Sequence, residues 1–318
     1  MIFRSNRTYT ALAAGATTLG MVVLSACGAA DTGSSDYDKI TLVVPPWVGA
    51  EANVVVAQYV MQTEMDLDVS TKQMSETVAF DALNSGKVEA LLEDWGGAPK
   101  KIQTYVEEKK TVVDGGSLGV VGHIGWYVPK YFADAHPDVL DYKNLNKYAK
   151  DFESQETPGK GTLLQGDPSY TSYDAAIIKN LKLNFATHSL GAESTQITEF
   201  RKNFKTKKPF ISYWWQPQWL NAELDLVEVK LPPYKEGCQD DPKKVACAYP
   251  DTDLKKYLNA DFAEKGGDAA EFLKNFKWTT EDQNAVAKMI TKDQMSPEDA
   301  AKKWVEANKD KVDGWLPK

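Results

Sequence analysis

The sequence is poor in arginine, histidine and cysteine. After the first 27 residues its only arginine is Arg201, and the whole chain has three histidines and three cysteines. The histidines, at positions 123, 136 and 188, lack the spacing of a zinc site. A Gly-x-Ser-x-Gly motif and a phosphate-binding glycine loop with a lysine are also missing. These absences count against an exported hydrolase, and we expect no catalytic residues, no metal and no cofactor.

Long hydrophobic runs are missing too, except near the N-terminus. Residues 11–23 are apolar or small and follow two arginines, but this run is too short for a comfortable membrane span. We therefore predict that residues 1–26 are a secretory signal peptide. Residues 24–27, Leu-Ser-Ala-Cys, resemble a bacterial lipobox, which implies cleavage before Cys27 and a lipid on its sulfur. The alternative is an ordinary signal peptide. Residues 27–37 are then a small, polar, lipidated tether.

The charge is acidic. The formal net charge is −8, and removal of the signal, which holds two arginines and no acid, leaves about −10. An acidic body argues against nucleic acid as a partner and suits a cationic or zwitterionic ligand. Solubility alone would explain the charge equally well.

Two cysteines remain after the proposed lipidation site. Cys238 and Cys247 flank a polar loop, and two close cysteines in an exported protein most simply form a disulfide. Closing so short a loop stabilises a protein by about 2–3 kcal/mol. Metal binding is the weaker alternative, because no histidine lies nearby.

Strand and helix patterns alternate along the rest of the chain. We predict strands at residues 39–44, 88–92, 117–128, 162–165, 209–213 and 226–229. We predict helices at residues 50–63, 76–85, 99–109, 173–181, 196–204, 269–276, 280–291 and 296–307. This order indicates an α/β fold with mostly parallel sheets covered by helices on both faces. About 280 residues are enough for two lobes, each with its own core.

Tryptophan recurs where predicted strands end. Trp47 follows the first strand, Trp95 follows another, and Trp214 and Trp215 follow the strand at 209–213. Ligands of open α/β sheets bind at such carboxyl ends, where several rings could surround a quaternary ammonium ion. A core role for each tryptophan is the alternative.

Other side chains could complete such a site. The loop at residues 166–173 follows a predicted strand, and its amides and hydroxyls, with Ser172 among them, could hold a ligand carboxylate. Tyr170 or Tyr173 would add a ring. Asp94 or Glu51 could attract the cation, although either acid could equally cap the helix or turn that follows it.

A set of motifs gives a specific resemblance. The lipobox, the Asp-Trp-Gly segment at 94–96 and residues 122–129, 213–219 and 312–316 are similar to the glycine betaine/choline family of ABC-transporter substrate-binding proteins. The similarity extends over residues 38–318. It implies a type II-like, two-lobed periplasmic-binding-protein fold, with lobe one at 38–121 plus 236–318, lobe two at 122–235, and the ligand in the cleft between them.

The resemblance also implies roles for single residues. Trp95 and Trp215 match tryptophans of the family's aromatic box, and Trp47 matches one that only some members have. Tyr170 is the nearest candidate for a fourth ring, where some members have tryptophan. Trp214 should point away from Trp215 into the core, because neighbouring side chains of a strand alternate. Trp126 is also expected in the core.

The function implied is that of a receptor rather than an enzyme. It would be lipid-anchored on the extracytoplasmic face of the cell membrane, bind glycine betaine, choline or a related quaternary amine, and pass it to an ABC permease with its ATPase subunits. A receptor for an amino acid or another methylated amine is the alternative, but amino-acid receptors use an arginine clamp and arginine is scarce here. Betaine and choline are not distinguished.

Overall fold

The computed structural model describes Tyr37 and residues 39–318 of the chain. The predicted signal peptide, the lipidation site Cys27 and nearly all of the predicted tether lie outside the described residues. Within them, no helix is both long and apolar enough to cross a membrane.

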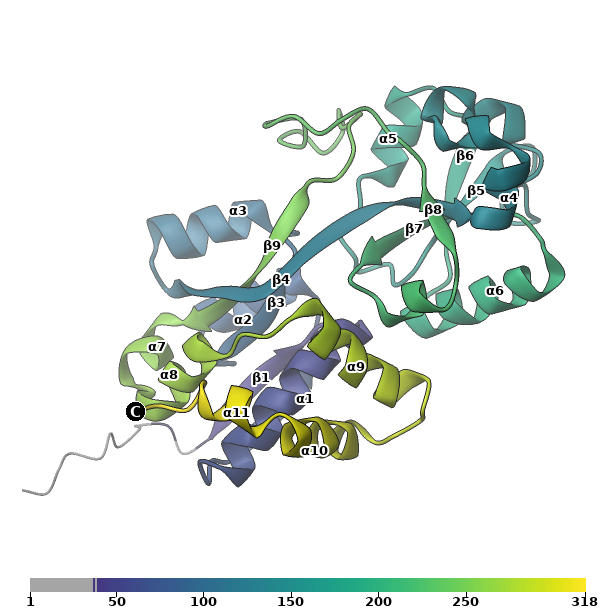
Figure 1. Cartoon of the computed structure of the whole chain (residues 1–318). Helices are drawn as coiled ribbons and strands as arrows, with labels where there is room; N and C mark the ends of the chain where they lie inside the picture. The colour runs from purple at the N-terminus through teal and green to yellow at the C-terminus, as the bar shows by residue number, and fades with distance from the viewer. Residues whose placement is uncertain (1–36, 38) are drawn as a thin grey trace, which may run out of the picture. The chain divides into compact units, whose positions relative to one another are not determined.

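The first group of strands is parallel. Strand β1 (Ile40–Val44) lies between β2 (Val69–Gln73) and β3 (Ala90–Asp94). β1 is a run of β-branched and leucine residues, with Leu42 and Val43 fully buried. Helices α1 (Val48–Thr63) and α2 (Glu76–Asn84) follow β1 and β2 (Figure 1). The sequence analysis missed β2, a short and mostly polar strand at the edge of the sheet.

The second group repeats this arrangement. Strand β5 (Gly161–Gln165) lies between β6 (Phe185–Ser189) and β7 (Ile211–Gln216), again in parallel. The accompanying helices are α4 (Lys130–Ala135), α5 (Asp174–Asn180) and α6 (Glu193–Thr206). β7 continues past the predicted end at residue 213. The sequence analysis placed Trp214 and Trp215 after the end of the strand, but both residues lie inside it.

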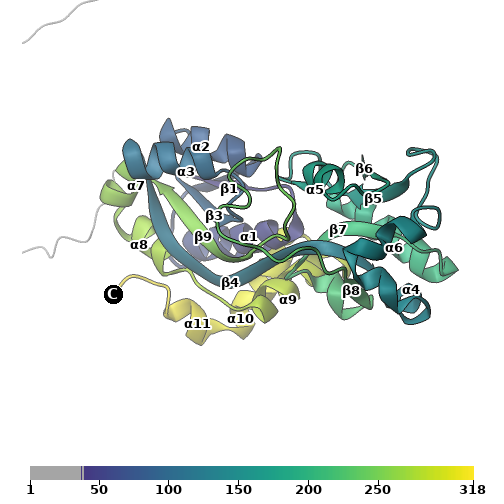
Figure 2. The same cartoon turned by 90° about the horizontal axis from the view of Figure 1, so that it is seen from above.

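Two long strands connect the groups. β4 (Val112–Pro129) pairs antiparallel with β9 (Asp251–Asn259) up to His123, and from His123 to Tyr127 it pairs with β7 (Figures 1 and 2). The short strand β8 (Leu226–Glu228) also pairs with β4. The sheet order is β2-β1-β3-β9-β4-β7-β5-β6. The predicted α/β fold is confirmed, although β9 and the first part of β4 were missed. The lobe boundaries at residues 122 and 235 stay predictions.

The last part of the chain is helical, as predicted. It contains α7 (Ala260–Lys265), α8 (Gly267–Asn275), α9 (Thr280–Thr291), α10 (Pro297–Ala307) and α11 (Lys309–Asp313). Ser296 caps α10 through its side chain, with a proline in the first turn. α9 and α10 both pack against α1.

The remaining helical elements are short and lie earlier in the chain. They are α3 (Pro99–Ile102) with a π-helical continuation (Gln103–Glu108), and 3₁₀ helices at Pro137–Leu140, Tyr142–Tyr148 and Trp219–Ala222.

Several tryptophans belong to the core, as expected. Trp126 and Trp214 are fully buried, and their indole nitrogens donate to Asp174 and Asn221. The ring of Trp214 nevertheless lies 4.5 Å from that of Trp215, centre to centre, so it does not point away from Trp215 as predicted. Trp304 stacks on Trp315, with an interplanar angle of 4°. These four tryptophans therefore serve the packing of the core, and Trp47, Trp95 and Trp215 have to be considered separately.

Candidate functional site

The four predicted rings line one cavity. Its volume is about 980 Å³, and Trp47, Trp95, Tyr170 and Trp215 all contribute to its wall. They come from separate segments: Trp47 precedes α1, Trp95 directly follows β3, Tyr170 lies between β5 and α5, and Trp215 lies in β7. The strand ends predicted to meet are thus brought together. We refer to these four side chains as the aromatic cage.

Tyr170 holds a central place in the aromatic cage. Its ring stands edge-to-face against Trp47, at 5.7 Å and 80° between ring planes, and against Trp215, at 5.7 Å and 88°. Its hydroxyl donates to the carbonyl oxygen of Pro46 at 2.9 Å. Burial raises the pKa of Tyr170 well above that of a free phenol, so the group stays neutral.

Trp95 lies against the backbone of β4. A Cβ atom added to Gly122 would come within 2.4 Å of the six-membered ring of Trp95. Only glycine leaves room for the indole here, so β4 supports the ring from behind.

One buried carboxylate joins two of the cage rings. The indole Nε1 atoms of Trp47 and Trp95 both donate to Glu93 Oε1, at 2.6 and 2.7 Å. Glu93 Oε2 accepts from Asn53 Nδ2 and from Gln283 Nε2. The sequence analysis gave Glu93 no role. The sequence shows that Glu93 stands two residues before Trp95, but its partners Asn53 and Gln283 belong to the distant helices α1 and α9.

Asp94 is not a cavity residue, contrary to our expectation. Its Oδ2 accepts from the backbone N–H of Gly96 at 3.0 Å, and the residue is only 3% exposed. Side chains of β3 alternate, so Asp94 turns away from the indoles that Glu93 contacts. Two acids do line the cavity, Glu76 and Asp240, and Glu76 Oε1 accepts from the backbone N–H of Trp95 at 2.5 Å. Burial and the neighbouring charge of Asp94 raise the pKa of Glu76 well above its usual range.

Ser172 lines the cavity, but its hydroxyl already has partners. Ser172 Oγ accepts from Gln165 Nε2 at 2.8 Å and from the backbone N–H of Asp174 at 3.1 Å. Nearby amides are also used: Ser169 N–H donates to Asp167, and Tyr173 N–H donates to the hydroxyl of Tyr249. The backbone amides of this loop therefore offer a ligand carboxylate fewer donors than the sequence suggested.

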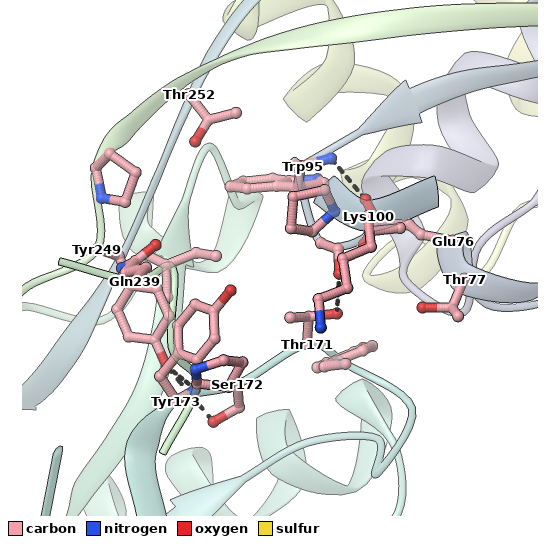
Figure 3. A pocket seen from close by; sticks show the side chains of 18 of the residues that line it. Glu76, Thr77, Trp95, Lys100, Thr171, Ser172, Tyr173, Gln239, Tyr249 and Thr252 are labelled. Carbon is pink, nitrogen blue, oxygen red and sulfur yellow. Dashed lines mark hydrogen bonds between the residues drawn. The ribbon is translucent and has the colours of Figure 1, made fainter. Parts of the chain in front are cut away.

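The sequence analysis missed Tyr213 and Tyr249. Both line the cavity, and their rings meet edge-to-face at 5.9 Å and 89°. Tyr249 also stacks on Tyr173, and its hydroxyl donates to Asp174 at 2.8 Å. Figure 3 shows Tyr249 and Tyr173 on the side of the cavity opposite Trp95. The local sequence signal for Tyr249 was an aromatic residue between a cysteine of the predicted disulfide and a proline.

The predicted disulfide is present between Cys238 and Cys247. Gln239, Asp240 and Pro242, inside the loop that it closes, line the same cavity (Figure 3 labels Gln239). The disulfide loop, residues 238–247, is thus part of the site. Sequence analysis predicted the bond but not the position of the loop.

Buried acids surround the aromatic cage. Burial raises the pKa of Glu93, Asp94, Asp174 and Glu193, and for Glu193 the value reaches about 7. Among the described residues that line the cavity, the basic side chains are Lys100 and Lys101. Arg201 is not there, because it pairs with Glu223. The wall is therefore rich in π faces, holds two acids and two lysines, and has no guanidinium clamp.

Comparison with known proteins places this chain in a family. The sequence profile of the substrate binding domain of ABC-type glycine betaine transport systems matches residues 38–307. The chain belongs to this family. The resemblance of the sequence motifs to the family is thereby confirmed, and the protein is a substrate-binding domain of this class of transport system.

Individual relatives agree with this assignment. The chain is 27% identical over 308 residues to a trimethylamine N-oxide-binding protein of Pelagibacter ubique (strain HTCC1062), covering 92% of this chain and 95% of the relative. It is 31% identical over 141 residues to the glycine betaine/carnitine transport binding protein GbuC of Listeria monocytogenes (serotype 1/2a, strain 10403S), covering 43% of this chain and 42% of GbuC.

Solved structures share the fold. Lactococcal OpuAC in its closed conformation with glycine betaine superposes with a TM-score of 0.70 at 22% identity. The match covers 88% of this chain and 100% of OpuAC. A choline-binding protein in complex with choline gives a TM-score of 0.68 at 16% identity, covering 87% and 91%. The predicted two-lobed periplasmic-binding-protein fold is confirmed.

Proposed function

We propose that this chain is the extracytoplasmic receptor of an ABC importer and binds a small methylated ammonium compound in the aromatic cage. Glycine betaine, choline and trimethylamine N-oxide are the candidate ligands. The observation that carries the proposal is that four rings from separate segments, Trp47, Trp95, Tyr170 and Trp215, line one cavity.

The chemistry of the cage suits a trimethylammonium group. Such a cation is covered by methyl groups and has no N–H to donate, so aromatic faces and nearby acids are its best partners. A desolvated cation–π contact contributes about 0.5–2 kcal/mol per ring. Four rings can therefore supply a large part of the roughly 8 kcal/mol that corresponds to micromolar affinity.

An amino-acid ligand is the alternative, and the site does not favour it. Recognition of a carboxylate first would call for an arginine, and Arg201 pairs with Glu223 instead. The amides of Ser169 and Tyr173 are engaged within the protein. Both facts favour a ligand recognised first through its cationic head.

The remaining parts of the proposal concern transport. We infer that the chain makes and breaks no covalent bond of its ligand and passes it to a permease driven by ATPase subunits. A lipid on Cys27 would hold it at the membrane. Among the described residues no group of three or more acids, histidines or cysteines could hold a metal ion.

Closure around the ligand is supported by hydrogen bonds between segments of the two predicted lobes. The hydroxyl of Tyr170 donates to Pro46 O, Thr171 Oγ1 donates to Gly97 O, and Glu193 Oε2 accepts from Val48 N–H. Each bond joins a residue before position 122 to one after it. Exclusion of water by closure lowers the local dielectric constant, which strengthens the attraction between ring faces and a cation.

The proposal is tested by calorimetric titration with glycine betaine, choline, trimethylamine N-oxide and proline side by side. We expect saturable binding of at least one methylated ammonium compound and none of proline. No heat from any of the methylated compounds would refute the proposal.

Substitutions in the aromatic cage extend this test. We expect Trp95→Leu and Trp215→Leu each to weaken binding by at least about fivefold, because each removes a ring from the cation. Trp304→Leu is the control: Trp304 stacks on Trp315 and does not line the cavity, so this change should lower stability and leave affinity intact. Equal affinities in all three variants would exclude the cage.

A further inference from the structure

Glu93 lies behind two rings of the aromatic cage. It is 1% exposed, and its Oε1 accepts both indole N–H groups, from Trp47 at 2.6 Å and from Trp95 at 2.7 Å. These indoles belong to segments that follow different strands, so a single oxygen atom fixes their mutual position. Glu93 itself is not among the residues that line the cavity.

All four hydrogen-bond partners of Glu93 are neutral donors. Besides the indoles, Asn53 Nδ2 and Gln283 Nε2 donate to Oε2. Burial raises the pKa of Glu93, but the four donors oppose this shift, and they leave little room for an acid proton, which favours the ionised carboxylate. The two amides also turn their nitrogen atoms toward Glu93 although Asn53 Oδ1 and Gln283 Oε1 are then buried without a partner. A carboxylate, and not a carboxylic acid, explains this orientation.

We propose that Glu93 is a positioning and specificity-determining residue, which holds Trp47 and Trp95 in place and makes the cage prefer a cation to a neutral group of the same shape. This proposal rests on the proposed function, because it concerns the same site. Glu93 acts through the rings and does not contact the ligand.

Two physical effects lead to this preference. An indole whose N–H donates to a carboxylate carries more electron density on its ring face, which strengthens the cation–π interaction. The carboxylate also attracts the cation directly across the width of an indole, in a region where water does not screen it. Neither effect acts on an uncharged ligand.

A purely structural role for Glu93 can be separated from this one by Glu93→Gln. Glutamine has nearly the same shape, and its oxygen can still accept both indole N–H groups. Its NH₂ can donate to Asn53 Oδ1 and Gln283 Oε1 once those amides turn over, which gives both oxygens the partners that they lack. The substitution thus removes the charge and leaves the rings supported.

The experiment compares ligands that differ only in charge. Choline is paired with 3,3-dimethylbutan-1-ol and glycine betaine with 3,3-dimethylbutanoate, in which carbon replaces the nitrogen. We expect Glu93→Gln to weaken binding of the better quaternary amine by at least about tenfold, while affinity for its carbon analogue changes by less than about threefold. Glu89→Gln is the matched control, since Glu89 is also a buried acid but accepts from Thr41 N–H away from the cavity.

The outcomes separate the two proposals. If the wild type binds a quaternary amine and Glu93→Gln weakens both members of a pair equally, or neither, Glu93 has no role in charge selection and the proposed function stands. If the wild type binds no methylated ammonium compound, both proposals fail.

A second measurement does not depend on the variant folding. In a ¹H–¹⁵N spectrum of the wild type, the indole N–H signals of Trp47 and Trp95 should lie downfield of that of Trp315, which donates to the carbonyl oxygen of Lys277. Trp126, which donates to the Asp174 carboxylate, supplies the reference for a charged acceptor. Signals of Trp47 and Trp95 at the position of Trp315 would overturn the proposed ionised state of Glu93.

Discussion

At the scale of single residues, the proposed site combines aromatic rings that contact one another with a buried carboxylate that accepts hydrogen bonds from two of them. Tyr170 contacts Trp47 and Trp215 edge-to-face, and Glu93 bonds the indoles of Trp47 and Trp95. Burial of so many carboxyl groups costs stability, because a charge in a protein interior loses its hydration. The acids therefore make the stability of the fold depend on pH.

Glu193 provides a test of this dependence. Its Oε2 accepts from Val48 N–H at 2.7 Å, its Oε1 accepts from Gln218 Nε2 at 3.0 Å, and burial raises its pKa to about 7. Because the folded pKa lies above the unfolded one, the neutral form stabilises the fold at low pH, and this contribution is lost as the pH rises through about 7.

We expect Glu193→Gln, which is neutral at every pH, to gain stability relative to the wild type as the pH rises. The difference in melting temperature should increase between about pH 5 and about pH 8.5, by at most roughly 10 °C. Differential scanning calorimetry at several pH values measures it. A difference that stays constant with pH, or falls, would contradict the assignment.

The residues that form or support the cavity could be predicted from the sequence only in part. Trp47, Trp95 and Trp215 were found because a large ring next to a proline, a glycine or a strand end is visible locally. Glu93 and Tyr249 were not found, since their roles depend on partners from distant segments, such as Gln283 of α9 and Asp174 of α5. Asp94 was expected at the cavity and does not line it, because the sequence did not show which acids face the cavity.

At the scale of elements, the disulfide loop combines a covalent cross-link with three residues of the cavity wall. Cys247 precedes Tyr249 by two residues, and Gln239, Asp240 and Pro242 line the cavity. The covalent bond limits how far this loop can move from the cavity. A bond that closes a short loop also restricts the unfolded chain.

We expect the double variant Cys238→Ser, Cys247→Ser to lose about 2–3 kcal/mol of unfolding free energy. It should also bind the ligand severalfold more weakly, because the loop and Tyr249 are less firmly positioned. Denaturant titration and calorimetry measure the two effects. Reductant should reproduce both in the wild type and change neither in the variant. An unchanged free energy of unfolding, or two free thiols in the mass spectrum of the non-reduced protein, would rule out this role.

Elements with strong periodicity were predicted well, and others were not. The helix at 280–291 matches α9 residue for residue, because its cap and apolar face are local signals. β9 was missed because lysines and aspartates interrupt its pattern, although Lys256 is fully buried, with its Nζ donating to Lys274 O and Phe276 O. β2 is a polar edge strand, which becomes a strand only by pairing with β1.

At the scale of the whole molecule, β4 and β9 run between two parallel groups of strands, and the cavity is lined by residues of both groups. The sequence predicted the α/β class and, through family motifs, the two-lobed fold. It did not predict that antiparallel strands connect the groups, since long-range pairing leaves no local signal. This arrangement brings ring-bearing segments of the two groups to the same cavity.

The most direct test is a crystal structure of the protein with choline or glycine betaine bound. We expect the trimethylammonium nitrogen to lie within about 6 Å of the ring centres of Trp47, Trp95 and Trp215. The polar end of the ligand should point toward Ser172. A cationic head bound outside the aromatic cage, or a ligand held first by its carboxylate with the rings uninvolved, would contradict the account.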